Sequence, residues 1–206
     1  MTDAWNTESI RHGITRVAAA IDDSADELNR LDGALGDGDL GVTMLRGVRG
    51  LAEAAPDLPE DVGKALFQCA QVFTKVSGST YGTLLATGLM AAAKATRGRT
   101  QVPWSEVSEL LGLALAEMSR RGRAELGDKT VLDAVAAARA ATEGMDDPEA
   151  MAQAADQAVG EALDHFRDQP SRQGRARIFG EKSIGLDDPG MVAFKRITEA
   201  LVHGNA

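Results

Sequence analysis

Hydrophobic side chains recur at helical spacing along almost the whole chain. Stripes in which apolar residues return every three or four positions fall within residues 10–31, 42–51, 62–76, 84–93, 107–118, 131–135, 147–168 and 192–201. Pro56 ends the second stripe, and only residues 176–179 are typical of extended chain. The pattern predicts an all-α fold, an eight-helix antiparallel barrel or bundle, in which the many alanines let helices pack closely.

The residues with unusual chemistry lie between the predicted helices. The first junction carries three aspartates, Asp32, Asp37 and Asp39, separated by glycines. Asp32 is predicted to end the first helix, and the glycines allow the chain to curl back so that the carboxylates approach one another. Carboxylates held that close repel one another unless a cation lies among them. The loop therefore predicts a metal site.

Magnesium is the metal predicted for this loop, because the cluster offers only oxygen ligands. A calcium loop of the EF-hand kind is excluded, since counting from Asp32 or Asp37 places no glutamate at the twelfth position. Residues 36–41 also match the dinucleotide fingerprint G-x-G-x-x-G, but no predicted strand precedes them. A solvated acidic turn remains the alternative interpretation.

Three further junctions, at residues 77–82, 127–130 and 183–190, are rich in glycine and in hydroxyl or acidic side chains. In an antiparallel bundle alternate junctions share one end, so these segments are expected to form one rim with the aspartate loop. Backbone amides and hydroxyl groups at helix starts are donors for phosphate. A plain glycine turn is an equally good interpretation of residues 77–82 alone. Asp128 is predicted to cap the sixth helix.

The composition favours one compact domain over residues 1–206, because 44% of the residues are hydrophobic. The net charge of −9, with no run of more than two basic residues, argues against sequence-independent nucleic-acid binding. Cys69, the single cysteine, lies in an apolar helical pattern and is expected to be a packed thiol. The sequence shows neither a signal peptide nor an apolar run of membrane length, so a cytoplasmic protein without a membrane partner is expected.

Five motifs then point to a known family. In chain order they are the aspartate loop, residues 77–82 (SGSTYG), residues 121–130 (RGRAELGDKT), residues 174–176 (GRA) and residues 180–190 (GEKSIGLDDPG). Together they resemble the L subunit of dihydroxyacetone kinase, DhaL, over most of residues 28–200. Each motif is weak by itself, but five in the family's order are specific.

The resemblance implies an eight-helix barrel that holds ADP or ATP at one end, through two magnesium ions that bridge the phosphates to Asp32, Asp37 and Asp39. It also implies a set of nucleotide contacts, which consists of Leu40, Gly41, Thr43, Ser79, Thr80, Thr130, Arg175, Asp188, Pro189 and Gly190. Arg175 would add a fixed positive charge for phosphoryl transfer, and no side chain is assigned as a certain catalytic residue. Without the resemblance, we interpret Arg175 as an exposed arginine. Lys129 can equally be a surface lysine that follows Asp128.

In this family a separate K subunit holds the sugar as a covalent hemiaminal with its own histidine, and the L subunit docks over it with the nucleotide. The three histidines of this chain, His12, His165 and His203, are scattered on predicted helices and match no such role. The resemblance therefore implies a kinase subunit that does not phosphorylate sugar alone. Its donor is either exchangeable ATP or a phosphotransferase-system protein that rephosphorylates bound ADP. A homodimer is a further expectation.

Two departures from the family pattern concern the nucleotide pocket. Leu40 stands where the family commonly has histidine after the third aspartate, and the glycine loop at residues 77–82 is shorter. A paralogue acting on another small ketose or polyol is therefore one alternative, and a non-catalytic nucleotide-sensing module that docks on a partner protein is another. A metal-dependent hydrolase is the third and least favoured, because the sequence shows no general base.

Overall fold

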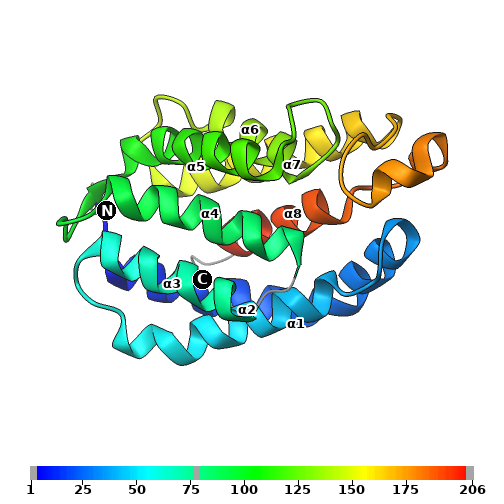
Figure 1. The fold of residues 1–206 in the computed structure, drawn as a ribbon. Coiled ribbons are helices and arrows are strands. Elements are labelled where there is room, and N and C mark those ends of the chain that lie inside the picture. Colours follow the sequence, from blue (N-terminus) through cyan, green and yellow to red (C-terminus); the bar gives the residue numbers. More distant parts are fainter. Residues whose placement is uncertain (1–3, 77–78, 203–206) are drawn as a thin grey trace.

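The computed structural model describes residues 4–76 and 79–202, which form the all-α bundle that the sequence predicts (Figure 1). Their eight α-helices are α1 (Thr7–Leu35), α2 (Leu40–Ala54), α3 (Val62–Val76), α4 (Thr80–Ala95), α5 (Val107–Gly122), α6 (Val131–Ala141), α7 (Pro148–Arg167) and α8 (Pro189–Val202). Short 3-10 helices lie in three connections: η1 (Ala55–Asp57), η2 (Trp104–Glu106) and η3 (Ala176–Ser183). A two-residue antiparallel pair joins β1 (Ala4–Trp5) to β2 (Val102–Pro103).

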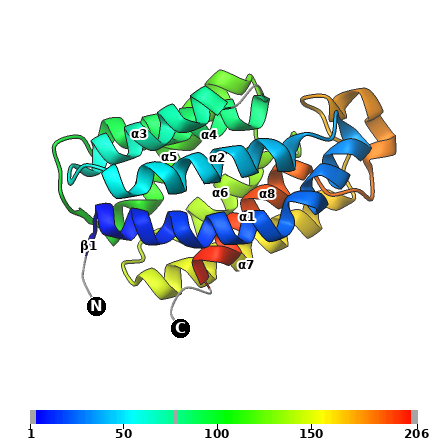
Figure 2. The same cartoon turned by 90° about the horizontal axis from the view of Figure 1, so that it is seen from below.

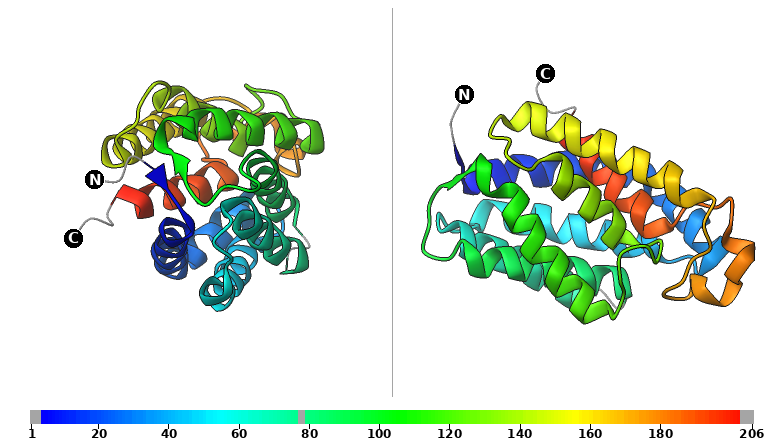
Figure 3. Two further views of the ribbon diagram at one scale, coloured as in Figure 1. Left: turned by 90° about the vertical axis from the view of Figure 1, so that its left-hand side faces the viewer. Right: turned by 90° about the horizontal axis from the view of Figure 1, so that it is seen from above.

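Each helix packs antiparallel against the next one along the chain, and α8 packs back on α1 to close the bundle (Figure 2). In the end-on view of Figure 3, α8 lies between α1 on one side and α6 and α7 on the other. Because the helix direction alternates, α2, α4, α6 and α8 all begin at the same end of the bundle. That end therefore collects the junctions that the sequence singles out.

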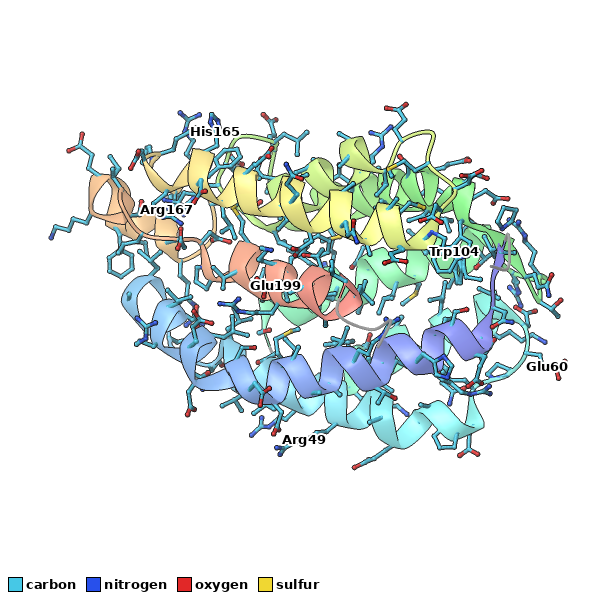
Figure 4. All side chains as sticks on the ribbon, turned by 180° about the vertical axis from the view of Figure 1, so that it is seen from behind. Arg49, Glu60, Trp104, His165, Arg167 and Glu199 are labelled. Carbon is cyan, nitrogen blue, oxygen red and sulfur yellow. The ribbon has the colours of Figure 1, made fainter. Side chains whose placement is uncertain are left out.

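The apolar faces of the helices meet in an extended core. Its buried members come from helices distant in sequence, among them Ile21 and Leu28 of α1, Met44 of α2, Leu132 of α6 and Val192 of α8. A second cluster forms around Trp5, Val62 and Val102, at the end of the bundle that Figure 4 marks with Glu60 and Trp104. Each fully buried aliphatic side chain stabilises the fold by about 1.5–3 kcal/mol. The core therefore fixes the helix ends at which the junctions lie.

Two glycines allow neighbouring segments to touch backbone to backbone. A Cβ on Gly41 would lie 2.0 Å from the carbonyl oxygen of Ala25, and one on Gly63 would lie 2.5 Å from the Cα of Arg97. Both distances are far inside van der Waals contact, so a side chain has no space at either position. The start of α2 consequently lies directly on α1, and Gly41 is a packing residue of this crossing.

The structure corrects several predicted boundaries and one element. Residues 176–179 open the 3-10 helix η3 and are not extended, because short-range bonds such as Ile178 N to Arg175 O (3.1 Å) curl the chain. Helix α1 continues beyond Asp32 to Leu35, so Asp32 occupies its last turn. Residues 80–82 already belong to α4, which makes that junction shorter than predicted.

Helix α6 is capped by Thr130, and the prediction that Asp128 caps it is wrong. Thr130 Oγ1 accepts a hydrogen bond from Leu132 N (3.2 Å), and Asp133 Oδ2 accepts one from Thr130 N (2.8 Å). Thr130 and Asp133 form a capping box, in which the side chain of each accepts from the backbone N–H of the other. Asp128 Oδ2 instead accepts from Glu125 N (2.9 Å) within the preceding turn.

The single cysteine and the described histidines lie on helices, as predicted. Cys69 is buried in α3, and burial raises the pKa of its thiol to about 11. His12 and His165 are exposed on α1 and α7, whereas His203 lies outside the described residues, as do Ser77 and Gly78 of the glycine-rich junction. Within residues 4–76 and 79–202, no helix is long and apolar enough to cross a membrane.

Replacing Gly41 by alanine is expected to destabilise the fold, because the new methyl group has no space against the backbone of α1. Overpacking of this kind costs about 1–3 kcal/mol, so urea denaturation of Gly41→Ala should give a free energy of unfolding lower by that amount. Gly160→Ala in α7 is the matched control: a Cβ there lies 3.6 Å from its nearest neighbour, and alanine favours a helix. Equal stability of the two variants would show that α1 and α2 do not touch as described.

Candidate functional site

A cleft of about 340 Å³ opens at the end of the bundle where α2, α4, α6 and α8 begin. Its volume lies in the range of about 300–1,000 Å³ that is typical of small-molecule sites. Most of the residues predicted to bind metal or nucleotide line it, namely Asp32, Asp37, Asp39, Leu40, Ser79, Thr80, Thr130, Arg175, Asp188, Pro189 and Gly190. Gly41 and Thr43 are not brought to its wall, because both are buried within the packing of α2.

A wider groove of about 610 Å³ lies between α6 and α7 but has different chemistry. Alanines such as Ala136, Ala137 and Ala158 supply much of its lining. None of the residues predicted to bind metal or nucleotide lines this groove. Within the described part of the chain, the cluster of side chains that could bind a metal is Asp32, Asp37 and Asp39, which lies outside it. The cleft at the helix starts is therefore the candidate site.

Three carboxylates converge on one wall of this cleft. Asp32, Asp37 and Asp39 each offer an oxygen, and these oxygens lie within 4.8 Å of one another. Gly38 shapes the loop with a φ of +75°, a left-handed conformation that suits glycine, and a Cβ on Gly36 would lie 2.7 Å from Asp32 Oδ1. Asp39 N closes the loop by donating to Asp32 Oδ2 at 2.9 Å. The chain thus curls back as its glycines predict.

The donor set of this aspartate cluster fits a hard divalent cation. Carboxylate oxygens are the ligands that magnesium prefers, and no thiol or imidazole belongs to the cluster. Oxygens on opposite sides of a magnesium ion lie about 4.2 Å apart, so the observed spacing is close to that of ligation. Asp37 and Asp39 remain exposed, which leaves room for water and phosphate ligands.

Four helix starts surround the same cleft. Ser79, Thr130 and Asp188 each accept a hydrogen bond from a backbone N–H of the helix that follows, at 3.2, 3.2 and 2.8 Å. The Asp39 side chain makes no such capping bond at the start of α2, which leaves its carboxylate for the aspartate cluster. The positive ends of the helix dipoles favour an anion, above all phosphate.

Arg175 reaches the aspartate cluster from the wall segment (residues 168–188), which connects α7 to α8 and includes η3. Its guanidinium Nη1 makes an ion pair with Asp37 Oδ2, and its side chain stays 66% exposed. Gln173, Gly174 and Ala176 of the wall segment also line the cleft. In Figure 1 this segment, coloured orange, projects beyond the bundle. Because an exposed ion pair is worth at most about 1 kcal/mol, Arg175 can exchange Asp37 for an anionic ligand.

Asp188 lies on the inner, drier part of the cleft. Burial raises the pKa of its carboxyl to about 7, although a hydrogen bond from Met191 N and the charge of Lys129 favour the ionised form. Tyr81 is its neighbour: burial, and then the Asp188 charge, raises the pKa of the phenol. The ring carbons of Tyr81 lie 3.1–3.2 Å from where a Cβ on Gly190 would be, so glycine at this helix start makes room for the ring.

Sequence reasoning missed part of this site. Tyr81, Leu84 and Leu132 supply apolar wall that no motif identifies as such. Lys129 is not a surface lysine: it is 1% exposed, and its ammonium group is bonded to backbone carbonyls of the wall segment and its edge. Its place in the motif at residues 127–130 is the signal that singles it out.

Comparison with known proteins identifies the family. The DAK2 domain model matches residues 34–203. The chain belongs to the DAK2 domain family. Over 183 residues it is 31% identical to a protein of Escherichia coli named PEP-dependent dihydroxyacetone kinase, ADP-binding subunit DhaL, and the match covers 86% of this chain and 87% of the relative. The resemblance found in the motifs is therefore confirmed.

Larger proteins contain the same DAK2 domain. The L-erythrulose 1-kinase of Mycolicibacterium smegmatis is 33% identical over 184 residues, which cover 87% of this chain and 32% of that protein. The crystal structure of the dihydroxyacetone kinase from C. freundii in complex with AMP-PNP and Mg²⁺ has a TM-score of 0.74 at 27% identity, and the match covers 93% of this chain and 33% of that one. The chain thus spans about a third of the length of these relatives.

Asp188 is expected to make the stability of this DAK2 domain fall as the pH rises from 4 to 7. The folded state keeps a proton on Asp188 up to a pKa of about 7, whereas the unfolded chain releases it near 3.8. The unfolded state therefore binds fewer protons over this range, and the free energy of unfolding decreases with pH.

Asp188→Asn removes this titration and keeps an acceptor for Met191 N. Urea denaturation at each pH gives the free energies of unfolding of the wild type and the variant. The wild-type value minus the variant value should decrease by up to about 4 kcal/mol from pH 4 to pH 7. A difference that stays constant with pH would contradict the raised pKa of the Asp188 carboxyl.

Proposed function

We propose that this DAK2 domain binds ADP or ATP with magnesium and is the phosphoryl-transferring part of a two-part kinase for a small ketose. The convergence of three carboxylates and four helix starts in one cleft carries this proposal. A nucleotide polyphosphate requires both features, a divalent cation and donors for its oxygens. The names of the relatives support it, because one is an ADP-binding subunit and another kinase is solved with AMP-PNP and Mg²⁺.

Asp32, Asp37 and Asp39 would hold magnesium, which when bound neutralises the charge of the phosphates. Donors for phosphate oxygens lie at the helix starts, on Ser79, Thr80 and Thr130. Arg175, already beside the aspartates, adds a fixed positive charge. Leu40 belongs to the apolar wall that excludes water. Phosphoryl transfer depends on positioning and electrostatics more than on covalent chemistry by the protein, so no side chain of the cleft needs to react.

The ketose is held by a second, K-type unit that docks over the mouth of the cleft. Apolar side chains on the wall segment favour such docking: Ile178 is 83% exposed, and Phe179, Ile184 and Leu186 are also exposed. Large apolar residues gathered beside a cleft are typical of a protein interface. Because the kinases matched above are about three times longer than this chain, the K-type unit is either a separate subunit or a further part of one polypeptide.

Two finer parts of the proposal concern the source of the phosphoryl group and the sugar that accepts it. PEP-dependent relatives favour a phosphotransferase-system protein that rephosphorylates ADP while it stays bound. Dihydroxyacetone is the first candidate acceptor, and L-erythrulose is the second, because two relatives at 33% and 32% identity are named as L-erythrulose kinases. The K-type unit, which holds the sugar, would decide between them.

Calorimetric titration with ADP should show binding that depends on magnesium and that falls at least about tenfold in Asp37→Asn, because the variant loses one charged ligand. Asp22→Asn is the matched control: Asp22 lies on the same helix as Asp32 but is exposed and paired with Arg49 at 2.7 Å. It should bind ADP as the wild type does. Binding that ignores magnesium, or an equal loss in both variants, would contradict the proposal.

Ile178→Ser is expected to slow phosphoryl transfer to the ketose at limiting concentrations of the K-type unit, because the variant loses apolar contact area at the mouth of the cleft. Its affinity for ADP should remain that of the wild type. Leu113→Ser serves as the control, since Leu113 is also exposed (42%) but lies on α5 within the bundle. The assay compares dihydroxyacetone with L-erythrulose, and equal rates for Ile178→Ser and the wild type would exclude docking at this surface.

A further inference from the structure

Lys129 is a charged side chain with almost no access to solvent. It is 1% exposed, and its Nζ donates to the carbonyl oxygens of Arg167 (3.2 Å), Gln169 (2.8 Å) and Ser183 (3.0 Å). An ammonium group has three N–H donors, so each donor has an acceptor. The side chain is thus fully satisfied by backbone, and no side-chain carboxylate is needed to bind it.

The three acceptors lie on both sides of Arg175 along the chain: Arg167 directly precedes the wall segment, and Gln169 and Ser183 lie within it. Arg167 ends α7, and Ser183 ends η3, so Lys129 joins the two sides of the loop that carries Arg175. Two further bonds of 2.8 Å close the same loop, from Gly185 N to Arg167 O and from Ser171 N to Ser183 Oγ. Figure 4 shows Arg167 at the base of the projecting segment. Lys129 therefore fastens this loop to the bundle, next to a backbone bond from Arg172 N to Asp128 O (3.1 Å).

The conformation of Lys129 shows that this contact is maintained at a cost. Its φ is +61°, a left-handed conformation that is unfavourable for an L-residue with a side chain. The following residue, Thr130, caps α6 at the cleft. Lys129 consequently connects a helix start on one side of the cleft with the wall segment on another. Its removal would take one hydrogen bond from each of three carbonyl oxygens, although Arg167 O also accepts from Gly185 N and Ser183 O from Leu186 N (3.3 Å).

We infer that Lys129 is a positioning residue for the nucleotide: it fastens the wall segment so that Arg175 faces the aspartate cluster and Gln173 lines the cleft. Lys129 does not line the cleft and acts through these residues. The consequence for nucleotide binding rests on the proposed function, but the fastening itself can be measured on the chain alone.

The experiment combines limited trypsin digestion without nucleotide and calorimetric titration of ADP in the presence of magnesium, on wild type and Lys129→Met. The wall segment offers trypsin three exposed arginines, Arg172, Arg175 and Arg177. In Lys129→Met, cleavage after these residues should be at least about tenfold faster, because the segment opens more often. The Kd for ADP should rise at least about fivefold.

Lys195→Met is the matched control. Lys195 lies on α8 and is also largely buried (18% exposed side chain), but it pairs with Asp156 of α7 at 2.6 Å and does not line the cleft. This variant should keep the wild-type cleavage pattern in the wall segment and the wild-type Kd, even if it lowers the melting temperature. A general loss of stability therefore does not imitate the expected result.

Wild-type cleavage rates and an unchanged Kd in Lys129→Met would overturn the inference. If Lys129→Met does not fold, Lys129→Gly gives the same decision, because glycine suits the φ of +61° and still lacks the ammonium group. Faster cleavage in the variant together with a wild type that binds no ADP would support the fastening and contradict the proposed function.

Discussion

The direction of the helices is the constraint on which the rest of this structure depends. Because each helix runs antiparallel to the next, the starts of α2, α4, α6 and α8 meet at one end, beside the aspartate loop at the end of α1. Helix starts attract anions, whereas the aspartate cluster attracts a cation. A chain with a net charge of −9 thereby presents a cluster that suits a cation beside helix starts that suit an anion.

The two sides of the cleft are stabilised by different interactions. The aspartate loop is fixed by glycines and by the packing of α2 on α1, where Gly41 leaves no space for a side chain. The wall segment has few buried apolar residues and is held by polar contacts, which include the bonds of Lys129 and the pair of Arg167 with Asp187 at 2.8 Å. The aspartate cluster is therefore held by tight packing, whereas the wall opposite it can open when local polar bonds break.

Much of the bundle is predictable from the sequence, because its apolar stripes are regular and its junctions are rich in glycine and proline. The approach of the aspartates is predictable too, since the glycines between Asp32 and Asp39 permit the tight reversal that brings the carboxylates together. Helix starts are less certain: Asp128 and Thr130 are both capping residues, and the bond from Thr130 N to Asp133 chooses between them. Only the family motif predicts that Arg175 lies at the site.

Lys129 and Gly41 show what sequence cannot supply. The acceptors of Lys129 lie 38–54 residues further along the chain, so its burial depends on how α7 and η3 return to α6. The family resemblance implies that Gly41 contacts the nucleotide, and the structure adds that Gly41 lies at a helix crossing. The sequence does not show this crossing, because a close approach of two backbones leaves no mark in a hydrophobic pattern. Both residues depend on contacts that form only when distant segments meet.

A crystal structure of the protein grown with ADP and Mn²⁺ tests the central claim most directly, because manganese replaces magnesium at oxygen sites and its anomalous signal locates it. The account predicts anomalous density between the carboxylates of Asp32, Asp37 and Asp39, with the phosphates of ADP directed at the starts of α4, α6 and α8. Manganese away from these aspartates, or ADP bound in the groove between α6 and α7, would contradict it.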